Sequence, residues 1–467
     1  MSDAAGTPGL LATLRAAVRG SNEDLTAIPV GRAVLLFAVP MVLEMSMESL
    51  FSVVDIFFVS KLGPDAVAAV GLTESMLALV FALAMGLSAG ATALIARRTG
   101  EKDAEGAAVA AVQVLAAAIA LSAALGVAGA ALSPGLLALM GASPDVVARG
   151  SGYTAVMLGG SVTIVLLFVV NAIFRSSGDA AAAMRSLWLA NGLNIALCPC
   201  FIFGLGPFPE LGVTGAAVAT TLGRGVGVAY QLALLARGRG RLAVLRRHLV
   251  LRAGVLADLF RISAGAALQV LAETASWLGL TRILATYGSA ALAGYTVSTR
   301  LAIFALLPPF GLANAAATLV GQNLGAGEPG RARRSVSAIA RYNVAFLGAV
   351  GAAFALVPGA FVGPLADDPA VAAFARDALR IIALGFVFFA YGMVAMQAFN
   401  GAGDTTTPLL INLVSFWCFK IPLAWVLAKP LGLGPPGVFL AITAAYSLQS
   451  LIAGVAFRRG RWARRAV

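Results

Sequence analysis

The chain of 467 residues is too apolar for a soluble protein, because 60% of its residues are hydrophobic and only 12% are charged, whereas soluble domains contain roughly 45–50% apolar residues. Its 33 Lys and Arg exceed its 21 Asp and Glu, which gives a formal net charge of +12. These basic residues lie between apolar runs and at the ends, as topology signals and lipid-headgroup contacts do, so we expect membrane lipids and not nucleic acid as partners.

The apolar runs predict an all-α integral membrane protein. A helix needs about 20 residues to cross the hydrocarbon core, and about six stretches of that length occur in each half of the chain, giving about twelve transmembrane helices. They are expected near residues 34–60, 66–96, 107–133, 151–175, 183–206, 212–236, 256–286, 290–322, 335–362, 374–400, 407–430 and 436–457. The preceding segment, residues 1–33, contains a short amphipathic helix around Leu10–Val18.

The loops between these stretches predict the orientation. Basic clusters such as Arg97 with Arg98 follow the even-numbered stretches, whereas the odd-numbered loops carry few basic residues. The positive-inside rule therefore places both termini in the cytoplasm of a multi-pass protein of the plasma (inner) membrane. Residues 237–255 are expected to form a basic cytoplasmic linker resting on anionic headgroups, and residues 458–467 a basic cytoplasmic tail.

A shift of 225 positions superimposes the first half of the sequence on the second. The matched pairs are Glu48 with Glu273, Gly63 with Gly288, Gly86 with Gly311, Gly100 with Gly325 and Asp179 with Asp404. This register predicts two pseudo-symmetric six-helix bundles, an N-lobe of residues 34–236 and a C-lobe of residues 256–457, with substrate space where they meet. Both lobes begin on the same side, so the repeat is parallel. Each aspartate of the last pair is interpreted as a helix N-cap.

Acidic residues within the first stretch indicate a cation-handling site. Glu44, Glu48 and Asp55 are spaced by four and seven residues and so share one helix face. A carboxylate at the membrane centre costs about 2.5–3.5 kcal/mol on insertion scales, so such a stripe is expected to face water, a cation or a partner. The alternatives are protonated or hydrogen-bonded packing residues and, for Glu44, a position near the membrane edge.

The second half repeats this stripe incompletely. Glu273 matches Glu48, but Gln269 stands at the position of Glu44 and Leu280 at that of Asp55. Glu273 lies deep in an apolar stretch and is a candidate for binding a cation or a proton. Lys420, in the middle of the eleventh stretch, is expected to snorkel towards an interface or to pair with an acid, either Glu273 or Asp404.

Several motifs resemble the multidrug and toxic compound extrusion (MATE) family. They include PMVLEMSMESLFSVVDIFFVSKLGPDAVAAVGL, GLSAGATALIARRTGEKD, LNIALCPCFIFGLG and QAFNGAGDTTTPLLINLVSFWCFKIPLAWVL, in that order along residues 30–457. The resemblance implies a twelve-helix, two-lobe antiporter that exports organic, often cationic, compounds in exchange for sodium ions or protons. It also implies coupling roles for Asp55, which precedes the V-x-x-L-G turn of the first helix, and for Glu273.

Two departures from the family pattern bear on the coupling ion. The family pairs Asp55 with an N-x-x-x-D motif on the fifth helix, but here Asn194 is kept and Cys198 replaces the aspartate. A thiol is a poor sodium ligand, although Thr220 offers a hydroxyl. The tenth helix also lacks the acid that other branches carry. These changes favour H+ over Na+, with a Na+ site at Asp55 and Asn194 as the alternative.

The sequence thus predicts a secondary antiporter, expected to be a monomer without cofactors, that exports small organic substrates. The candidates for the substrate cavity are Glu44, Gln269, Trp277, Met45, Tyr391, Gln397 and Lys420, and the candidates for coupling are Asp55, Glu273, Glu48, Asn194 and Thr220. A lipid-linked precursor flippase is the alternative, but it is expected to carry several cationic residues in its cavity. A membrane enzyme would need a catalytic cluster, which the single His248 in a basic loop does not provide.

Overall fold

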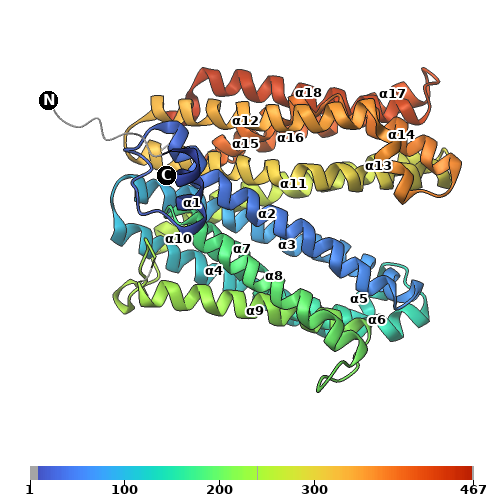
Figure 1. Cartoon of the computed structure of the whole chain (residues 1–467), viewed down its shortest axis with the longest axis horizontal. Coiled ribbons are helices and arrows are strands. Elements are labelled where there is room, and N and C mark those ends of the chain that lie inside the picture. Colours follow the sequence, from blue (N-terminus) through green and yellow to red (C-terminus); the bar gives the residue numbers. More distant parts are fainter. Residues whose placement is uncertain (1–8, 239, 465–467) are drawn as a thin grey trace.

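The computed structural model describes residues 9–238 and 240–464, and the helices in these ranges lie side by side in one elongated bundle (Figure 1). The long helices are α2 (Val30–Ser60), α3 (Pro64–Gly100), α4 (Ala104–Ala131), α6 (Pro144–Gly159), α7 (Ser161–Ser176), α8 (Ala180–Phe203), α9 (Val213–Arg237), α10 (Ala253–Ala285), α11 (Ser289–Gly325), α12 (Pro329–Leu356), α14 (Pro369–Ala383), α15 (Phe386–Gly401) and α18 (Pro435–Arg459). The shorter ones are α1 (Leu10–Arg19), α5 (Ser133–Leu139), α13 (Pro358–Val362), α16 (Thr406–Asn412) and α17 (Ile421–Ala428), with a π-helical segment (Leu413–Lys420) joining the last two. Single-turn 3-10 helices lie at Arg246–His248, Gly363–Leu365 and Arg461–Arg464.

The all-α membrane architecture predicted from the sequence is confirmed. Among the described residues, 10 helices or continuous helix pairs are long and apolar enough to cross a membrane, and α14 with α15 adds an eleventh as a pair bent by 55°. Helix α9 is 25 residues long and packs beside α8, but its glycines and its buried Arg224 and Gln231 make it less apolar. Its position in the bundle corresponds to the sixth predicted stretch. The short amphipathic helix near the N-terminus is present as α1.

The internal repeat extends to the irregular parts of the helices. The fourth span is broken at Gly160 between α6 and α7, and the tenth is broken before Phe386, where Gly385 stands 225 positions further on. Gly63 and Gly288 adopt φ angles of 95° and 96°, a region that favours glycine. The spans predicted at 151–175 and 374–400 are both present, the first as one span over α6 and α7 and the second as the pair bent by 55°. The breaks within them were not predicted, because one glycine among 52 gives no distinct signal.

Each lobe has its own hydrophobic core, but the two cores exchange helix ends. The first half of α2, including the buried Val34, Phe37 and Met41, packs into the core of the C-lobe. In return, Leu259 and Ile262 at the start of α10 belong to the core of the N-lobe. The predicted lobe boundaries therefore describe the sequence repeat but do not separate the two cores.

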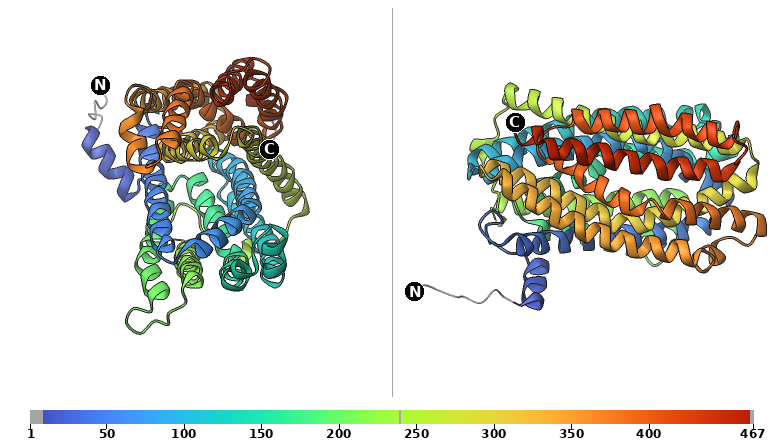
Figure 2. Two further views of the ribbon diagram at one scale, coloured as in Figure 1. Left: turned by 90° about the vertical axis from the view of Figure 1, so that its right-hand side faces the viewer. Right: turned by 90° about the horizontal axis from the view of Figure 1, so that it is seen from above.

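The first and last described segments of the chain lie at the same end of the bundle, here called the termini end (Figures 1 and 2), and glycines bring the lobes together there. A Cβ atom on Gly86 of α3 would lie 2.6 Å from the Ser263 carbonyl oxygen of α10, and one on Gly311 of α11 would lie 2.6 Å from the Met41 carbonyl oxygen of α2. Nearer the termini, Gly100 and Gly325 each press against the backbone of the other lobe. Only glycine allows backbones to approach this closely.

Hydrogen bonds and ion pairs hold the N-terminal segment over the lobe interface at the termini end. Arg241 of the linker donates to the carbonyl oxygens of Ser21 and Glu23 at 2.5 and 2.6 Å, and Arg331 of the C-lobe donates to that of Leu25 at 2.8 Å. Asp24 is bound by Lys102. Burial opposes the ionisation of Asp24, but hydrogen bonds from Lys102 and Thr26 lower its pKa to about 2.

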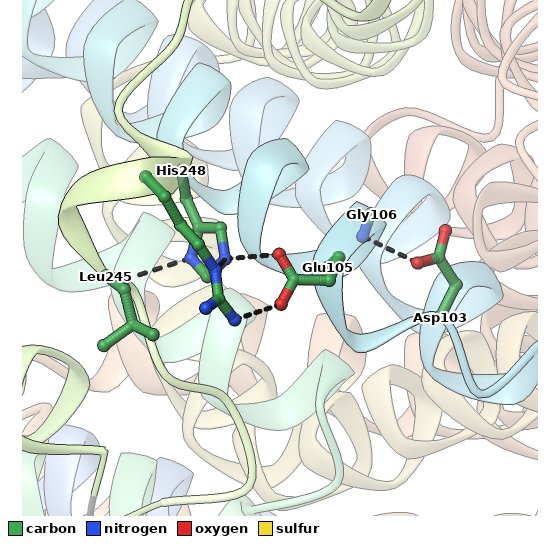
Figure 3. Close-up of polar contacts among 6 residues, drawn as sticks. Asp103, Glu105, Gly106, Leu245 and His248 are labelled. Atoms are coloured by element: carbon green, nitrogen blue, oxygen red, sulfur yellow. Dashed lines mark hydrogen bonds and ion pairs between the residues drawn. The ribbon is translucent and has the colours of Figure 1, made fainter.

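The linker contacts the start of α4 through His248. His248 is buried and its Nε2 lies 2.7 Å from a carboxylate oxygen of Glu105 at the start of α4, while its Nδ1 accepts from the Leu245 backbone N–H at 3.0 Å (Figure 3). Arg247 also pairs with Glu105. Part of the linker expected to rest on lipid headgroups is therefore engaged by protein groups.

Candidate functional site

A cavity of about 440 Å³ lies between the lobes. Its volume is within the range of small-molecule sites. Helices α2, α3, α7 and α8 contribute one wall, and α10, α11, α15, α16 and α18 contribute the other. Methionine and phenylalanine side chains, including Met45, Met393, Met396 and Phe389, provide apolar surface that adapts to different ligands. The cavity thus lies between the lobes, where the sequence repeat predicted substrate space.

The charged residues of the lining are mostly acidic. Glu44 and Glu48 come from α2, Glu273 comes from α10, and the only basic residue among the described lining is Arg175 at the end of α7. Three carboxylates therefore face one guanidinium. The three acids were predicted from the sequence as cavity or coupling residues, whereas Arg175 was not among the predicted site residues.

Arg175 is occupied by one of these acids. Its Nη1 lies 2.6 Å from Glu44 Oε1, and the two side chains are 11% and 2% exposed. Asn171 donates to the same oxygen at 3.1 Å and itself accepts a hydrogen bond from Gln231. Glu44 is therefore an ion-paired residue of the cavity wall. It is not a solvated group at the membrane edge, which was one of its two expected alternatives.

The repeat replaces this ion pair with an amide pair in the C-lobe. Gln269 stands 225 positions after Glu44 and Asn400 stands 225 positions after Arg175. The Gln269 Nε2 donates to Asn400 Oδ1 at 3.2 Å and to the Thr405 carbonyl oxygen at 2.9 Å. The two lobes thus use the same geometry, once with opposite charges and once with neutral hydrogen bonds.

The other two acids have hydrogen bonds but no ion pair. Asn191 donates to Glu48 Oε2 at 2.9 Å, and Tyr446 donates to Glu273 Oε1 at 3.4 Å. Within the described ranges, neither carboxylate has a basic nitrogen within the 4.0 Å that defines an ion pair. Asn191 was not among the predicted site residues, although a polar side chain in an apolar stretch was an available signal.

Three of the predicted N-lobe coupling residues, Asp55, Asn194 and Thr220, lie outside the cavity lining, whereas Glu48 is part of it. The Cys198 thiol donates a long hydrogen bond to Asp55, with Sγ 3.9 Å from Oδ1, while Arg224 and Glu74 lie near enough for their charges to act on it. Asn194 donates to Thr220 Oγ1 at 2.7 Å rather than to Asp55. In the described part of the chain, no group of three or more His, Cys, Asp or Glu is arranged to hold a metal ion.

The remaining cavity candidates divide into two groups. Met45, Gln269 and Gln397 line the cavity, whereas Trp277, Tyr391 and Lys420 lie behind its wall. Trp277 stacks on Tyr295 with ring centroids 6.2 Å apart. Sequence reasoning missed several lining amides, namely Asn171, Asn314, Asn400, Asn412 and Gln449.

A two-lobe helical bundle with a polar cavity at the lobe interface, inside helices long enough to cross a bilayer, defines an integral membrane transporter. The MatE family profile matches residues 40–200 and 266–426, once in each lobe. The chain therefore belongs to the MatE family of transporters, which are not enzymes.

Known proteins resemble the chain over nearly its whole length. It is 28% identical over 452 residues to the "Probable multidrug resistance protein NorM" of Thermotoga maritima, covering 93% of this chain and 94% of that protein. It is 27% identical to the "FAD transporter" of Shewanella oneidensis, covering 86% and 89%. A solved structure described as the outward-facing conformation of a multidrug resistance MATE family transporter superimposes with a TM-score of 0.87 and 27% identity, covering 93% and 96%.

Proposed function

We propose that this transporter exports organic cations of varied structure across the plasma membrane in exchange for protons. The observation that carries this proposal is the charge of the cavity: three carboxylates face a single guanidinium, which is already paired with Glu44. Glu48 and Glu273 are left to attract a cationic substrate, one from each lobe. The methionine and phenylalanine surface around them suits amphipathic molecules of different shapes.

The similar proteins support multidrug export more than the alternatives. Several relatives bear the name multidrug resistance protein. A lipid-linked precursor or a flavin dinucleotide carries phosphate groups, for which the described lining offers only the engaged Arg175. An acidic cavity of this kind disfavours both anions.

Protons are the proposed coupling ion because the oxygen ligands for sodium are incomplete around Asp55. Asp55 is hydrogen bonded by the Cys198 thiol, which is no oxygen ligand, and the Asn194 amide is hydrogen bonded to Thr220. Hard cations prefer several oxygen ligands, whereas a carboxylate alone is enough to carry a proton. We propose Asp55 and Glu273 as the principal proton carriers, with Glu48 as an additional one.

The lobes are proposed to be open to the outside in this structure. The glycine contacts and the N-terminal segment close the termini end, which carries the basic loops and is assigned to the cytoplasm by the positive-inside rule. Within the described residues, a hydrogen bond from Gln322 to the Ser176 carbonyl oxygen at 2.9 Å joins the lobes directly at this end. Because the cavity is formed within one chain, we propose that the transporter works as a monomer.

Uptake of tetraphenylphosphonium into proteoliposomes tests this function. Uptake is expected when the vesicle interior is one pH unit more acidic than the outside. It is not expected when sodium is more concentrated inside than outside at equal pH. The double variant Asp55→Asn with Glu273→Gln is expected to lose proton-driven uptake, while Asp65→Asn, which alters an exposed surface pair with Arg149, serves as the matched control. Uptake driven by sodium alone, or wild-type uptake by the double variant, would refute the proposal.

A further inference from the structure

Lys420 is the most unusual charged residue in the protein, because its side chain is fully buried in the membrane-spanning part of the C-lobe. It ends the π-helical segment Leu413–Lys420 and directly precedes α17. π-Helical turns are rare and occur frequently at functional sites. A buried lysine in a bilayer is costly unless it has a partner, and its burial rules out the snorkelling considered from the sequence.

Three aromatic rings surround the Lys420 ammonium. Its Nζ lies 4.2 Å from the ring centroid of Phe416, 5.2 Å from that of Trp277 and 5.9 Å from that of Tyr446. These rings come from the π-helical segment, α10 and α18. The ammonium also donates to Ser276 Oγ at 2.7 Å. Rings converging on one ammonium form an aromatic cage of the kind that recognises ligand cations.

The cage lies directly behind Glu273. Ser276 and Trp277 follow Glu273 by three and four residues, so all three share one face of α10. Tyr446, which forms part of the cage, donates to the Glu273 carboxylate at 3.4 Å. Glu273 lines the cavity and Lys420 does not. Their charges act on each other without forming an ion pair within 4.0 Å.

We propose that Lys420 is a tethered cation that takes the place of an external cation behind Glu273. Its caged ammonium serves as the counter-charge of Glu273 whenever that carboxylate is deprotonated, so the C-lobe needs no external cation to balance the charge between protonation steps. The titratable or charged groups facing it are Glu273 on α10 and Tyr446 on α18, and Tyr295 on α11 stacks behind Trp277. This inference rests on the proposed cation export and specifies how one lobe supports it.

Removing the positive charge of Lys420 should make uptake depend on an added cation. In sodium-free and potassium-free proteoliposomes, Lys420→Met is expected to lower proton-driven tetraphenylphosphonium uptake roughly tenfold or more, because one partner of a buried charge pair is lost. Added methylammonium or sodium should restore part of this uptake. Lys420→Arg keeps the positive charge and should retain most of it, and wild-type uptake should not respond to either added cation.

A matched control and a second measurement separate this inference from the proposed function. Lys429→Met makes the same change at an exposed lysine beyond α17, beside the Tyr287 ring, and should leave uptake unchanged. Without any transport, methylammonium should raise the unfolding temperature of purified Lys420→Met and not that of the wild type. Full uptake by Lys420→Met in cation-free buffer would overturn the inference, as would the absence of both the rescue and the thermal effect.

Discussion

The ion pair between Arg175 and Glu44 offers a test in which the C-lobe supplies the control. Arg175→Asn leaves a carboxylate that is 2% exposed without its cation. Breaking one side of a buried ion pair costs about 3–5 kcal/mol. The double variant Glu44→Gln with Arg175→Asn reproduces the amide pair that Gln269 and Asn400 form in the C-lobe, so we expect it to be within ~1 kcal/mol of the wild type, because replacing both partners is often neutral.

Thermal unfolding of the purified protein in detergent measures this difference. For a unit of about 150–250 residues, similar to one lobe, 1 kcal/mol shifts Tm by roughly 2–4 °C, so Arg175→Asn should lower Tm by roughly 6–20 °C. Arg149→Asn breaks a surface pair that is 70% and 41% exposed and should change stability by less than ~1 kcal/mol. If Arg175→Asn unfolds no earlier than the double variant, the reasoning from a buried unpaired charge is refuted.

Two further predictions concern the termini end. Gly311→Val would overpack the lobe interface at a cost of about 1–3 kcal/mol and shift the population towards lobes open at the termini end by roughly 5- to 150-fold. Maleimide labelling of Asn314→Cys in the cavity from the cytoplasmic side should therefore increase. The control Gly330→Val, whose Cβ would meet no atom within 4 Å, should not increase this labelling. The pKa of Asp24 is about 2, below the usual value of about 3.9. The stability that ionised Asp24 gives to the folded state is therefore complete above pH ~4 and is lost as pH falls from about 4 to about 2. Because Asp24 is 42% exposed, that contribution is small. Hydrogen exchange of residues 21–28, corrected for the intrinsic rate, should increase over this range in the wild type, and an equal increase in Asp24→Asn would contradict the assignment.

Much of the architecture was predictable because the chain contains two copies of one pattern. The 225-residue register predicted the two bundles, and the paired glycines Gly86 and Gly311 proved to lie where each lobe meets the other. The helix breaks were missed because a glycine by itself does not distinguish a break from close packing. The pairing of Gly160 with Gly385 in the same register was the signal available for them.

The candidate site was harder to predict because it depends on which side chains meet. An acid on one helix identifies a polar face, but its partner is selected by packing between helices far apart in sequence, as for Arg175 and Glu44. Their repeat partners Asn400 and Gln269 change together, and this joint change was the signal available in the sequence. For Lys420, the rings that enclose it come from separate spans, and the sequence alone left its partner open.

The exchange of helix ends between the cores has a consequence for biosynthesis. The first half of α2 leaves the ribosome well before most of the core that it joins, which includes Leu280 and Tyr295. During synthesis of the linker and the start of the C-lobe, the first half of α2 therefore lies in the bilayer without the C-lobe residues against which it packs. A truncated chain that ends after α9 would keep that surface exposed to lipid, which makes the C-lobe a folding partner of the N-lobe as well as its partner in transport.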